Sequence, residues 1–309
     1  MTRVFGSGEF RYEVVDNWAK RPKYWSFADV AGVGVDSQDR VYVFNRSPHP
    51  VMVFDKEGNF IRSWGEGIFS RPHGAFIDQT DSIWCTDDAD HIVRKFDTNG
   101  NLLLTIGTSG FRSDTGYDGK NLNSIKRAGP PFNRPTKAVI APSGELYVSD
   151  GYGNARIHKF SQEGKHLLSW GEPGGGPAQF ALPHCVVVDK QGRVYVADRE
   201  NRRIQVFNKD GESIAIWAGL ERPTDMVIVN DKYLFVAELN HRVSIWDLSG
   251  NVLVHWGGQE GASNDAGLFM APHTIAIDSR GVLYVGEVCD TVAGYDRGSR
   301  TIQKFIPVR

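Results

Sequence analysis

Three histidines, His73, His184 and His273, each follow a proline and stand at one register of a repeated sequence pattern. Three imidazoles that leave one coordination position open form the ligand set of many catalytic zinc sites. Nickel, iron and cobalt can use the same ligands, so zinc is the first expectation among divalent transition metals. The alternative is that Pro-His belongs to the repeat and only packs there. The histidines occur only in every second repeat, since the same register of the intervening repeats holds Ala31, Thr136 and Thr224. This alternation favours a metal site over simple packing.

The repeat consists of an aromatic residue, a short polar run that ends in glycine, and an alternating apolar run. It is seen around Gly58 and returns around Gly100, Gly164, Gly211 and Gly250, at intervals of roughly 40 to 48 residues where no insertion intervenes. Such a pattern is typical of a β-hairpin. A second hairpin precedes each one, and two hairpins give the four antiparallel strands of a propeller blade. The sequence therefore predicts an all-β, six-bladed β-propeller, with residues 1–309 as a single domain.

The first strands of the six blades are predicted at Val30–Asp36, Gly74–Asp78, Lys137–Ala141, Cys185–Asp189, Asp225–Val229 and Thr274–Asp278. The sixth blade ends early, at Thr301–Arg309, and lacks its outermost strand. The N-terminal segment Phe10–Trp18 has the length and the aromatic end to supply this strand, so we expect the N-terminus to close the ring in the last blade.

The first strand of a blade is innermost, so the histidine register surrounds the central channel in this prediction. Alternate blades of six lie about 120° apart, which suits three converging imidazoles. The second strand is antiparallel to the first, so the residues after it surround the same opening of the central channel, called the mouth below. Two loops, Thr108–Pro131 and Gly257–Phe269, are expected to overhang this mouth. A metal with polar walls and loops above it predicts an enzyme site. The residues around the mouth are Asn45, Arg46, Asp87, Asp88, Asp150, Tyr152, Asp198, Arg199, Glu200, Glu238 and Glu287.

Two stretches, Ser149–Ile157 and Val196–Gln205, together with the three Pro-His sites, resemble peptidyl-α-hydroxyglycine α-amidating lyase. The resemblance covers nearly the whole chain and is strongest across Arg134–Phe207. It implies a zinc lyase that cleaves an N-acyl hemiaminal, the α-hydroxyglycine end of a peptide, to an amide and glyoxylate. It implies zinc on His73, His184 and His273, Tyr152 as general base, and Arg46 holding the carboxylate or stabilising developing charge. We also expect Met270 and Asp87 to contact the substrate.

The sequence departs from this family at several positions. Met270 lies one residue further from the third histidine than in the family, and Thr274 replaces an aspartate that binds calcium there. Lys137 occupies the equivalent position in blade three and could replace the charge of that cation, so calcium is not expected. We expect no fused oxygenase domain, and a long loop follows blade two. A smaller substrate, with an N-acyl or a ureido group, fits these departures.

Several alternatives remain at the sequence level. Tyr152 could be an aromatic that packs at the rim, and Arg46 could be a surface charge. A metal-dependent hydrolase would use zinc-activated water, with Asp87, Asp88, Glu238 or Glu287 as base. The repeat resembles the NHL repeat, and a non-catalytic NHL scaffold would bind protein through an exposed apolar patch.

The composition limits partners and compartment. The formal net charge is −2, which argues against nucleic acid as partner, and no apolar run reaches the roughly 18 residues of a membrane span. The three cysteines are distant in sequence and odd in number, so disulfides are not expected. The first residues have no apolar signal-peptide core, so we expect no signal peptide. We therefore expect a cytoplasmic protein whose partner is a small-molecule or peptide-terminal substrate.

Overall fold

Short antiparallel strands joined by tight turns make up most of the computed structural model, which describes residues 3–259 and 261–308. The turn between β5 (Val51–Phe54) and β6 (Phe60–Trp64) is an example. Gly58 has a φ of +85°, and its N–H donates to the carbonyl of Asp55 over 2.9 Å. The Asp55 carboxylate accepts the N–H of Asn59 at 2.8 Å. Glycine reaches this left-handed conformation without strain, which explains its recurrence in the repeat.

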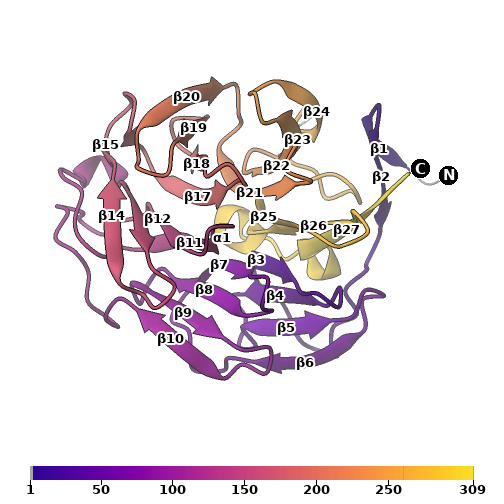
Figure 1. The fold of residues 1–309 in the computed structure, drawn as a ribbon. Coiled ribbons are helices and arrows are strands. Elements are labelled where there is room, and N and C mark those ends of the chain that lie inside the picture. The colour runs from indigo at the N-terminus through magenta and orange to yellow at the C-terminus, as the bar shows by residue number, and fades with distance from the viewer. Residues whose placement is uncertain (1–2, 260, 309) are drawn as a thin grey trace. The chain divides into compact units, whose positions relative to one another are not determined.

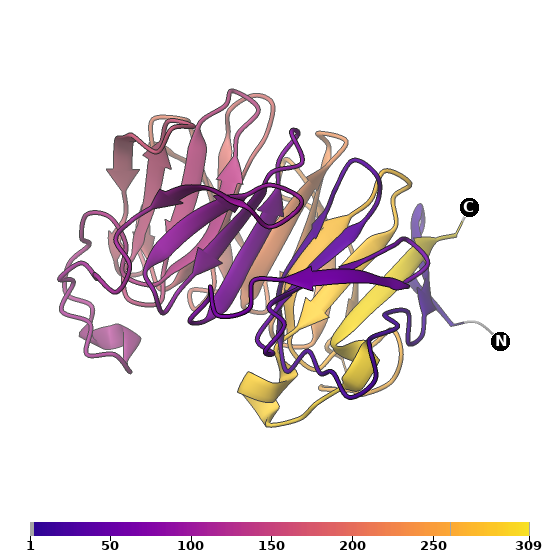
Figure 2. The ribbon, with the colours of Figure 1, turned by 90° about the horizontal axis from the view of Figure 1, so that it is seen from below.

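The chain forms two compact units. One of them, residues 69–223, contains three four-stranded antiparallel sheets and a two-stranded parallel pair, β15 and β16 (Figure 1). The 3₁₀ turn η1 lies in the loop between β10 and β11 and projects away from these sheets (Figure 2). The elements of this unit are β7 (Pro72–Ile77), β8 (Ile83–Asp87), β9 (Ile92–Phe96), β10 (Leu102–Ile106), η1 (Leu122–Ser124), β11 (Pro135–Ile140), β12 (Leu146–Asp150), β13 (Arg156–Phe160), β14 (His166–Trp170), β15 (Glu172–Pro173), β16 (Gln179–Phe180), β17 (Pro183–Val188), β18 (Val194–Asp198), β19 (Arg203–Phe207) and β20 (Ser213–Ala218).

The other unit comprises residues 1–68 and 224–309. It contains two four-stranded sheets and a five-stranded sheet in the order β1-β2-β27-β26-β25. The pairing of β2 with β27 confirms that the N-terminal segment completes the last blade, and β1 adds a fifth strand outside it. Besides β5 and β6, the elements of this unit are β1 (Val4–Ser7), β2 (Phe10–Val15), β3 (Val30–Val35), β4 (Val41–Asn45), β21 (Pro223–Val229), β22 (Tyr233–Glu238), β23 (Arg242–Asp247), β24 (Val252–Gly257), β25 (Pro272–Ile277), β26 (Leu283–Glu287), α1 (Cys289–Ala293), η2 (Gly298–Thr301) and β27 (Ile302–Pro307).

These sheets are the blades of a six-bladed β-propeller, which confirms the predicted fold class. Helix is confined to α1 and two 3₁₀ turns within the described residues. None of the described helices is long and apolar enough to cross a membrane.

The second strand of each blade carries much of the core. Strands β8, β12 and β18 are buried along their whole length, whereas the outer strand β10 is mostly exposed. In one cluster Trp84 of β8 packs with Phe132 and Phe160. Burial of such side chains stabilises the fold by about 1.5–3 kcal/mol each. The strands therefore give a rigid base to the loops at their ends.

The first strands begin two residues earlier than predicted in five of the six blades, so the histidine register lies inside the strand. Where β17 pairs with β18, Pro183 opposes Asp198 and Cys185 opposes Ala197. His184 is therefore the extra residue of a β-bulge. His273 occupies the same place in β25. The strand can begin at proline, because the first position of a strand tolerates a residue that donates no N–H.

Candidate functional site

Tyr152 lies between His73 and His184 in the unit formed by residues 69–223. Its hydroxyl oxygen is 3.3 Å from Nε2 of His73 and 3.2 Å from Nε2 of His184. The two imidazole centroids are 4.8 Å apart, and both rings are buried. Two predicted metal ligands and the predicted base thus lie in direct contact. The role of Tyr152 as base stays a prediction.

Hydrogen bonds to backbone carbonyls fix the tautomers of His73 and His273. Nδ1 of His73 lies 2.6 Å from the carbonyl oxygen of Thr136. A carbonyl only accepts, so Nδ1 carries the hydrogen and Nε2 presents its lone pair, as in histidines that bind a metal through Nε2. His273, in the other unit, makes the same bond to the carbonyl of Ala31 at 2.9 Å. Ala31 and Thr136 hold the histidine register in their own blades, so the repeat itself supplies these carbonyls.

Three guanidinium groups surround Tyr152. Nη1 of Arg199 donates to the phenol oxygen over 3.2 Å. The Cζ atoms of Arg71, Arg134 and Arg199 lie 5.6, 5.4 and 5.4 Å from the ring centroid, within the range of cation–π attraction. Sequence reasoning placed Arg199 at the mouth without a role and missed Arg71 and Arg134. The available signal was that both of the missed arginines directly precede a proline of a first strand.

Each acidic partner of these arginines is shared by two guanidinium groups. The buried Asp88 carboxylate forms ion pairs with Arg71 and, at 3.5 Å, with Arg134. Glu200 pairs with Arg199 at 2.8 Å and with Arg222 at 2.6 Å. Burial alone would raise the pKa of Glu200, but these two arginines outweigh it and lower that pKa. Positive charge therefore exceeds negative charge among these six side chains.

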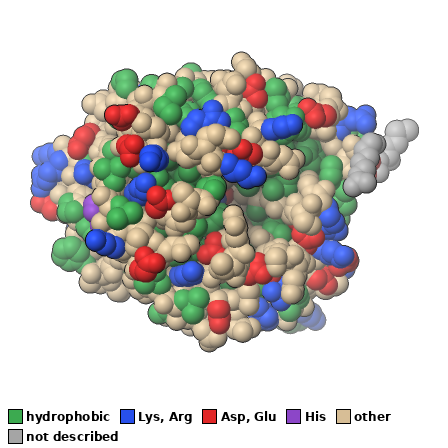
Figure 3. Space-filling view, in the orientation of Figure 1, with side chains coloured by type: hydrophobic (Ala, Val, Ile, Leu, Met, Phe, Trp, Pro, Cys, Tyr) green, Lys and Arg blue, Asp and Glu red, His purple; other side chains and the backbone are tan. Residues whose placement is uncertain are grey.

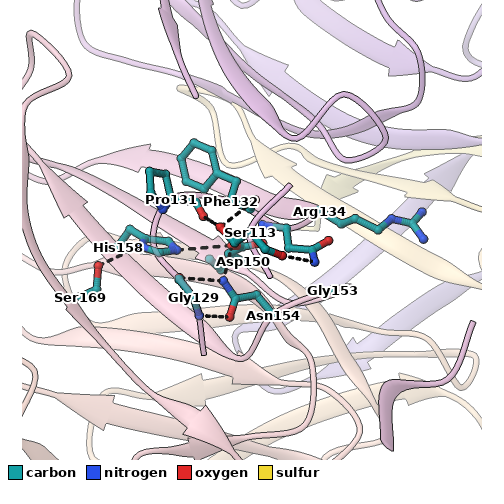
Figure 4. Close-up of polar contacts among 12 residues, drawn as sticks. Ser113, Gly129, Pro131, Phe132, Arg134, Asp150, Gly153, Asn154, His158 and Ser169 are labelled. Carbon is teal, nitrogen blue, oxygen red and sulfur yellow. Dashed lines mark hydrogen bonds and ion pairs between the residues drawn. The ribbon is translucent and has the colours of Figure 1, made fainter. Parts of the chain in front are cut away.

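The buried carboxylate of Asp150, at the end of β12, holds the turn that carries Tyr152 (Figure 4). Its Oδ2 accepts the backbone N–H of Asn133 at 2.9 Å and the side-chain amide of Asn154 at 2.8 Å. Nε2 of His158 lies 3.3 Å from the same oxygen. Because Asp150 and Asn154 flank the three residues of the turn, these bonds fix the position of Tyr152.

The Thr108–Pro131 loop packs against the Tyr152 turn, close to the place predicted for it. The hydroxyl of Thr115 donates to the carbonyl of Gly153 over 2.5 Å. Gly129 and Asn154 exchange two hydrogen bonds of 3.1 Å (Figure 4). A Cβ atom on Gly153 would lie 2.1 Å from Oδ1 of Asn133, so this close approach requires glycine.

Asp87, which we expected to contact the substrate, forms hydrogen bonds with backbone N–H groups. Its carboxylate accepts the N–H groups of Ser70 and Arg71 at 2.6 and 3.0 Å and is almost completely buried. The structure thus gives Asp87 a supporting role for the turn into β7. A contact with substrate stays a prediction.

The other two predicted site residues lie in the unit that contains both termini. Nη1 of Arg46 donates to the Asp29 carboxylate and to the Thr291 hydroxyl, both at 2.9 Å. The Arg46 side chain is 10% exposed, so it is no solvated surface charge. Met270 is half-buried and packs against a cluster that includes Ala271 and Val288. Their roles toward a substrate stay predictions.

Glu238 and Glu287, which were considered as bases for a hydrolase, also bind neighbouring groups of the protein through their carboxylates. Glu238 is buried and accepts bonds from Ser244 and Arg242. Glu287 is buried with Arg297 and accepts the N–H of Ala271 at 2.9 Å. Burial raises the pKa of both carboxyl groups, although these partners act in the opposite direction. Such engaged carboxylates are poorly placed to receive a proton from water.

The face drawn in Figure 3 carries acidic and basic side chains interspersed with apolar ones. On this face, the charges alternate in sign rather than forming one basic field of the kind that binds nucleic acid.

Comparison with known proteins adds to this description. The NHL repeat family matches residues 132–160 and 180–207. The chain is 33% identical to human NHL repeat-containing protein 3 over 315 residues, which cover 96% of this chain and 84% of that protein. It is 32% identical over 253 residues to peptidylglycine alpha-amidating monooxygenase of Rattus norvegicus, with 66% of this chain and 23% of that protein covered. The structure of the gluconolactonase XC5397 from Xanthomonas campestris matches with a TM-score of 0.63 at 13% identity, over 97% of this chain and 90% of that one, which shows a similar fold.

Proposed function

Since the chain belongs to the family of NHL repeat-containing protein 3 and is more distantly similar to amidating monooxygenases, we propose that it is a zinc-dependent lyase. Its substrate in this proposal is an α-hydroxyglycine-type hemiaminal, N-acyl or ureido, which it cleaves to an amide and glyoxylate. The observation that carries the proposal is the Tyr152 hydroxyl, held against two imidazoles and an arginine N–H.

The donor set suits a metal ion. In this proposal the ion is bound by His73, His184 and His273, which share one register of the repeat. In His73 and His273 the Nδ1–carbonyl bond leaves Nε2 for the metal. Zinc is the metal expected with three histidines, and other divalent transition metals can bind the same ligands. A bound zinc would supply Lewis acidity toward the hydroxyl oxygen of the substrate.

The chain's own residues account for the proton transfers. In its phenolate form, Tyr152 accepts the proton of the substrate hydroxyl while the carbon–nitrogen bond of the hemiaminal breaks, and it then passes this proton to the amide nitrogen. Glyoxylate leaves with the new carbonyl group, and the amide nitrogen takes up the proton, so no proton is gained or lost overall. Arg199 keeps an N–H directed at the phenol oxygen, where it stabilises negative charge during the transfer. Arg46 is proposed to hold the substrate carboxylate, since guanidinium forks suit carboxylates.

The test combines metal analysis with product detection. We expect about one zinc per chain in protein purified without added metal, and loss of that zinc in His184→Ala. His166→Ala is the matched control, because His166 lies on the outer strand β14 and hydrogen-bonds to Ser169 at 2.6 Å. Glyoxylate release from N-acetyl-α-hydroxyglycine or ureidoglycolate then identifies the lyase. Absence of stoichiometric metal would refute the proposal in favour of a non-catalytic scaffold, and metal with hydrolysis but no glyoxylate would favour the hydrolase.

A further inference from the structure

Arg71 and Arg134 approach Tyr152 from two neighbouring blades and share a single carboxylate. Arg71 precedes the first strand β7, and Arg134 precedes the first strand β11. Both form ion pairs with Asp88, and both guanidinium groups lie within 5.6 Å of the Tyr152 ring centroid. Two positive charges against one negative charge leave one positive charge in excess beside the phenol.

The two arginine side chains are partly exposed to solvent, whereas the aspartate that pairs with them is not. The side chains of Arg71 and Arg134 are 29% and 23% exposed, but Asp88 is fully buried. Asp88 therefore anchors the inner side of the pair and leaves guanidinium N–H groups at the surface of the site. Planar guanidinium groups bind carboxylates through paired charge-assisted hydrogen bonds.

The pair is also held in place before any ligand arrives. Asp88 pairs with both guanidinium groups, and the backbone N–H of Arg134 donates to Nδ1 of His91 at 3.1 Å. The N–H of Arg71 is bound by the Asp87 carboxylate. Groups that are ordered in advance lose less conformational entropy when they bind an anion.

We propose that Arg71 and Arg134 form an anion subsite that takes a carboxylate on the acyl side of the substrate. The preferred substrate is then a dianion, with the hydroxyglycine carboxylate at one end and a second carboxylate at the other. The substrate class rests on the proposed lyase function, but the anion subsite does not, because it is built from Arg71, Arg134 and Asp88 alone.

A kinetic comparison tests the substrate class. N-succinyl-α-hydroxyglycine carries the second carboxylate, and N-succinamoyl-α-hydroxyglycine is its neutral counterpart of the same size. We expect kcat/KM for glyoxylate release to favour the acid about tenfold or more, mainly through KM, as charge-assisted hydrogen bonds allow. Arg71→Gln and Arg134→Gln should each bring the ratio to within about twofold of unity. Each single variant leaves Asp88 paired with the other guanidinium, which protects the fold.

Arg193→Gln is the matched control. Arg193 belongs to the same unit, is 36% exposed and pairs with the buried Asp189, so its removal should leave the ratio unchanged. Equal kcat/KM for the two substrates in the unaltered protein would overturn the proposal. A fall in kcat for both substrates at an unchanged ratio would also overturn it, because the arginines would then act only on Tyr152.

Calorimetric titration with succinate separates this proposal from the lyase function. We expect succinate binding to persist in His184→Ala and to weaken about tenfold or more in Arg71→Gln. If this pattern holds and neither substrate yields glyoxylate, the lyase proposal fails and the anion subsite stands. If glyoxylate is released but succinate binds equally to the unaltered protein and Arg71→Gln, the subsite is refuted and the lyase stands.

Discussion

Replacing Tyr152 by phenylalanine removes one oxygen atom and keeps the ring. In the structure this oxygen contacts Nε2 of His73, Nε2 of His184 and the Arg199 guanidinium. Zinc would take the Nε2 lone pairs, so in the zinc-loaded protein the hydrogen bond from Arg199 is the contact that the variant removes. The ring contacts with the arginines remain available, because they depend on the face of the ring. The variant therefore tests the hydroxyl rather than the shape of the site.

The expected loss follows from the role of the hydroxyl. A positioned base contributes about 10²–10⁴-fold to turnover, which corresponds to about 3–5 kcal/mol of barrier at roughly 1.4 kcal/mol for each factor of ten. The stability effect should be much smaller, because one hydrogen bond contributes about 1 kcal/mol net. We expect zinc content to be retained, since the histidines are unchanged.

The assay measures glyoxylate release from N-acetyl-α-hydroxyglycine together with zinc content and thermal unfolding. Tyr195→Phe is the matched control, because its buried hydroxyl donates to Asp189 at 3.0 Å, away from the histidines. The control should lose stability but keep turnover within about twofold. Turnover of Tyr152→Phe within about threefold of the unaltered protein would refute the role of Tyr152 as base.

Two further predictions concern the scaffold. Asp150→Asn should lower the free energy of unfolding by about 1.5–3 kcal/mol, because a buried acceptor of bonds from Asn133 and Asn154 loses its charge; an unchanged melting temperature would contradict this. Asp16→Asn should remove part of the acid sensitivity, because the hydrogen bond from Arg300 lowers the pKa of Asp16. That stabilisation, at most about 1 kcal/mol for this exposed pair, is complete above the usual aspartate pKa and lost as pH falls through the lowered pKa. Urea titrations at pH 6 and pH 3 should therefore differ less for the variant, and an unchanged difference would contradict the assignment.

The blades could be predicted because their signals are local. A glycine such as Gly58 marks its own turn, and alternation marks the strands on either side. Counting back from the strand end then placed His73, His184 and His273 on one register. The strand starts were wrong because a bulge depends on pairing with another strand. His184 is an extra residue only relative to the pairing of Pro183 with Asp198 and Cys185 with Ala197.

The walls of the site were less predictable, since a residue at the right end of a strand can still point away from the mouth. Asp87 and Glu287 end their second strands, as expected, but their carboxylates accept N–H groups that precede the first strand of the same blade. An acid there satisfies backbone donors that would otherwise be buried without a partner. Arg71 and Arg134 reach Tyr152 instead, and no local pattern reports the direction of a long side chain.

The division between fixed and variable positions explains how one repeat can build a specific site. Strand-end acids hold the turns of blades two, three, four and six, so the residue in the bulge and the residue before the proline can vary there without loss of the blade. In blade two these positions carry His73 and Arg71, and in blade three they carry Thr136 and Arg134. The bulge residue then decides whether a blade contributes a nitrogen donor, and the residue before proline decides whether it contributes charge. It follows that a related propeller with the same histidines but neutral residues in place of Arg71 and Arg134 should lose the preference for a second carboxylate while keeping its metal.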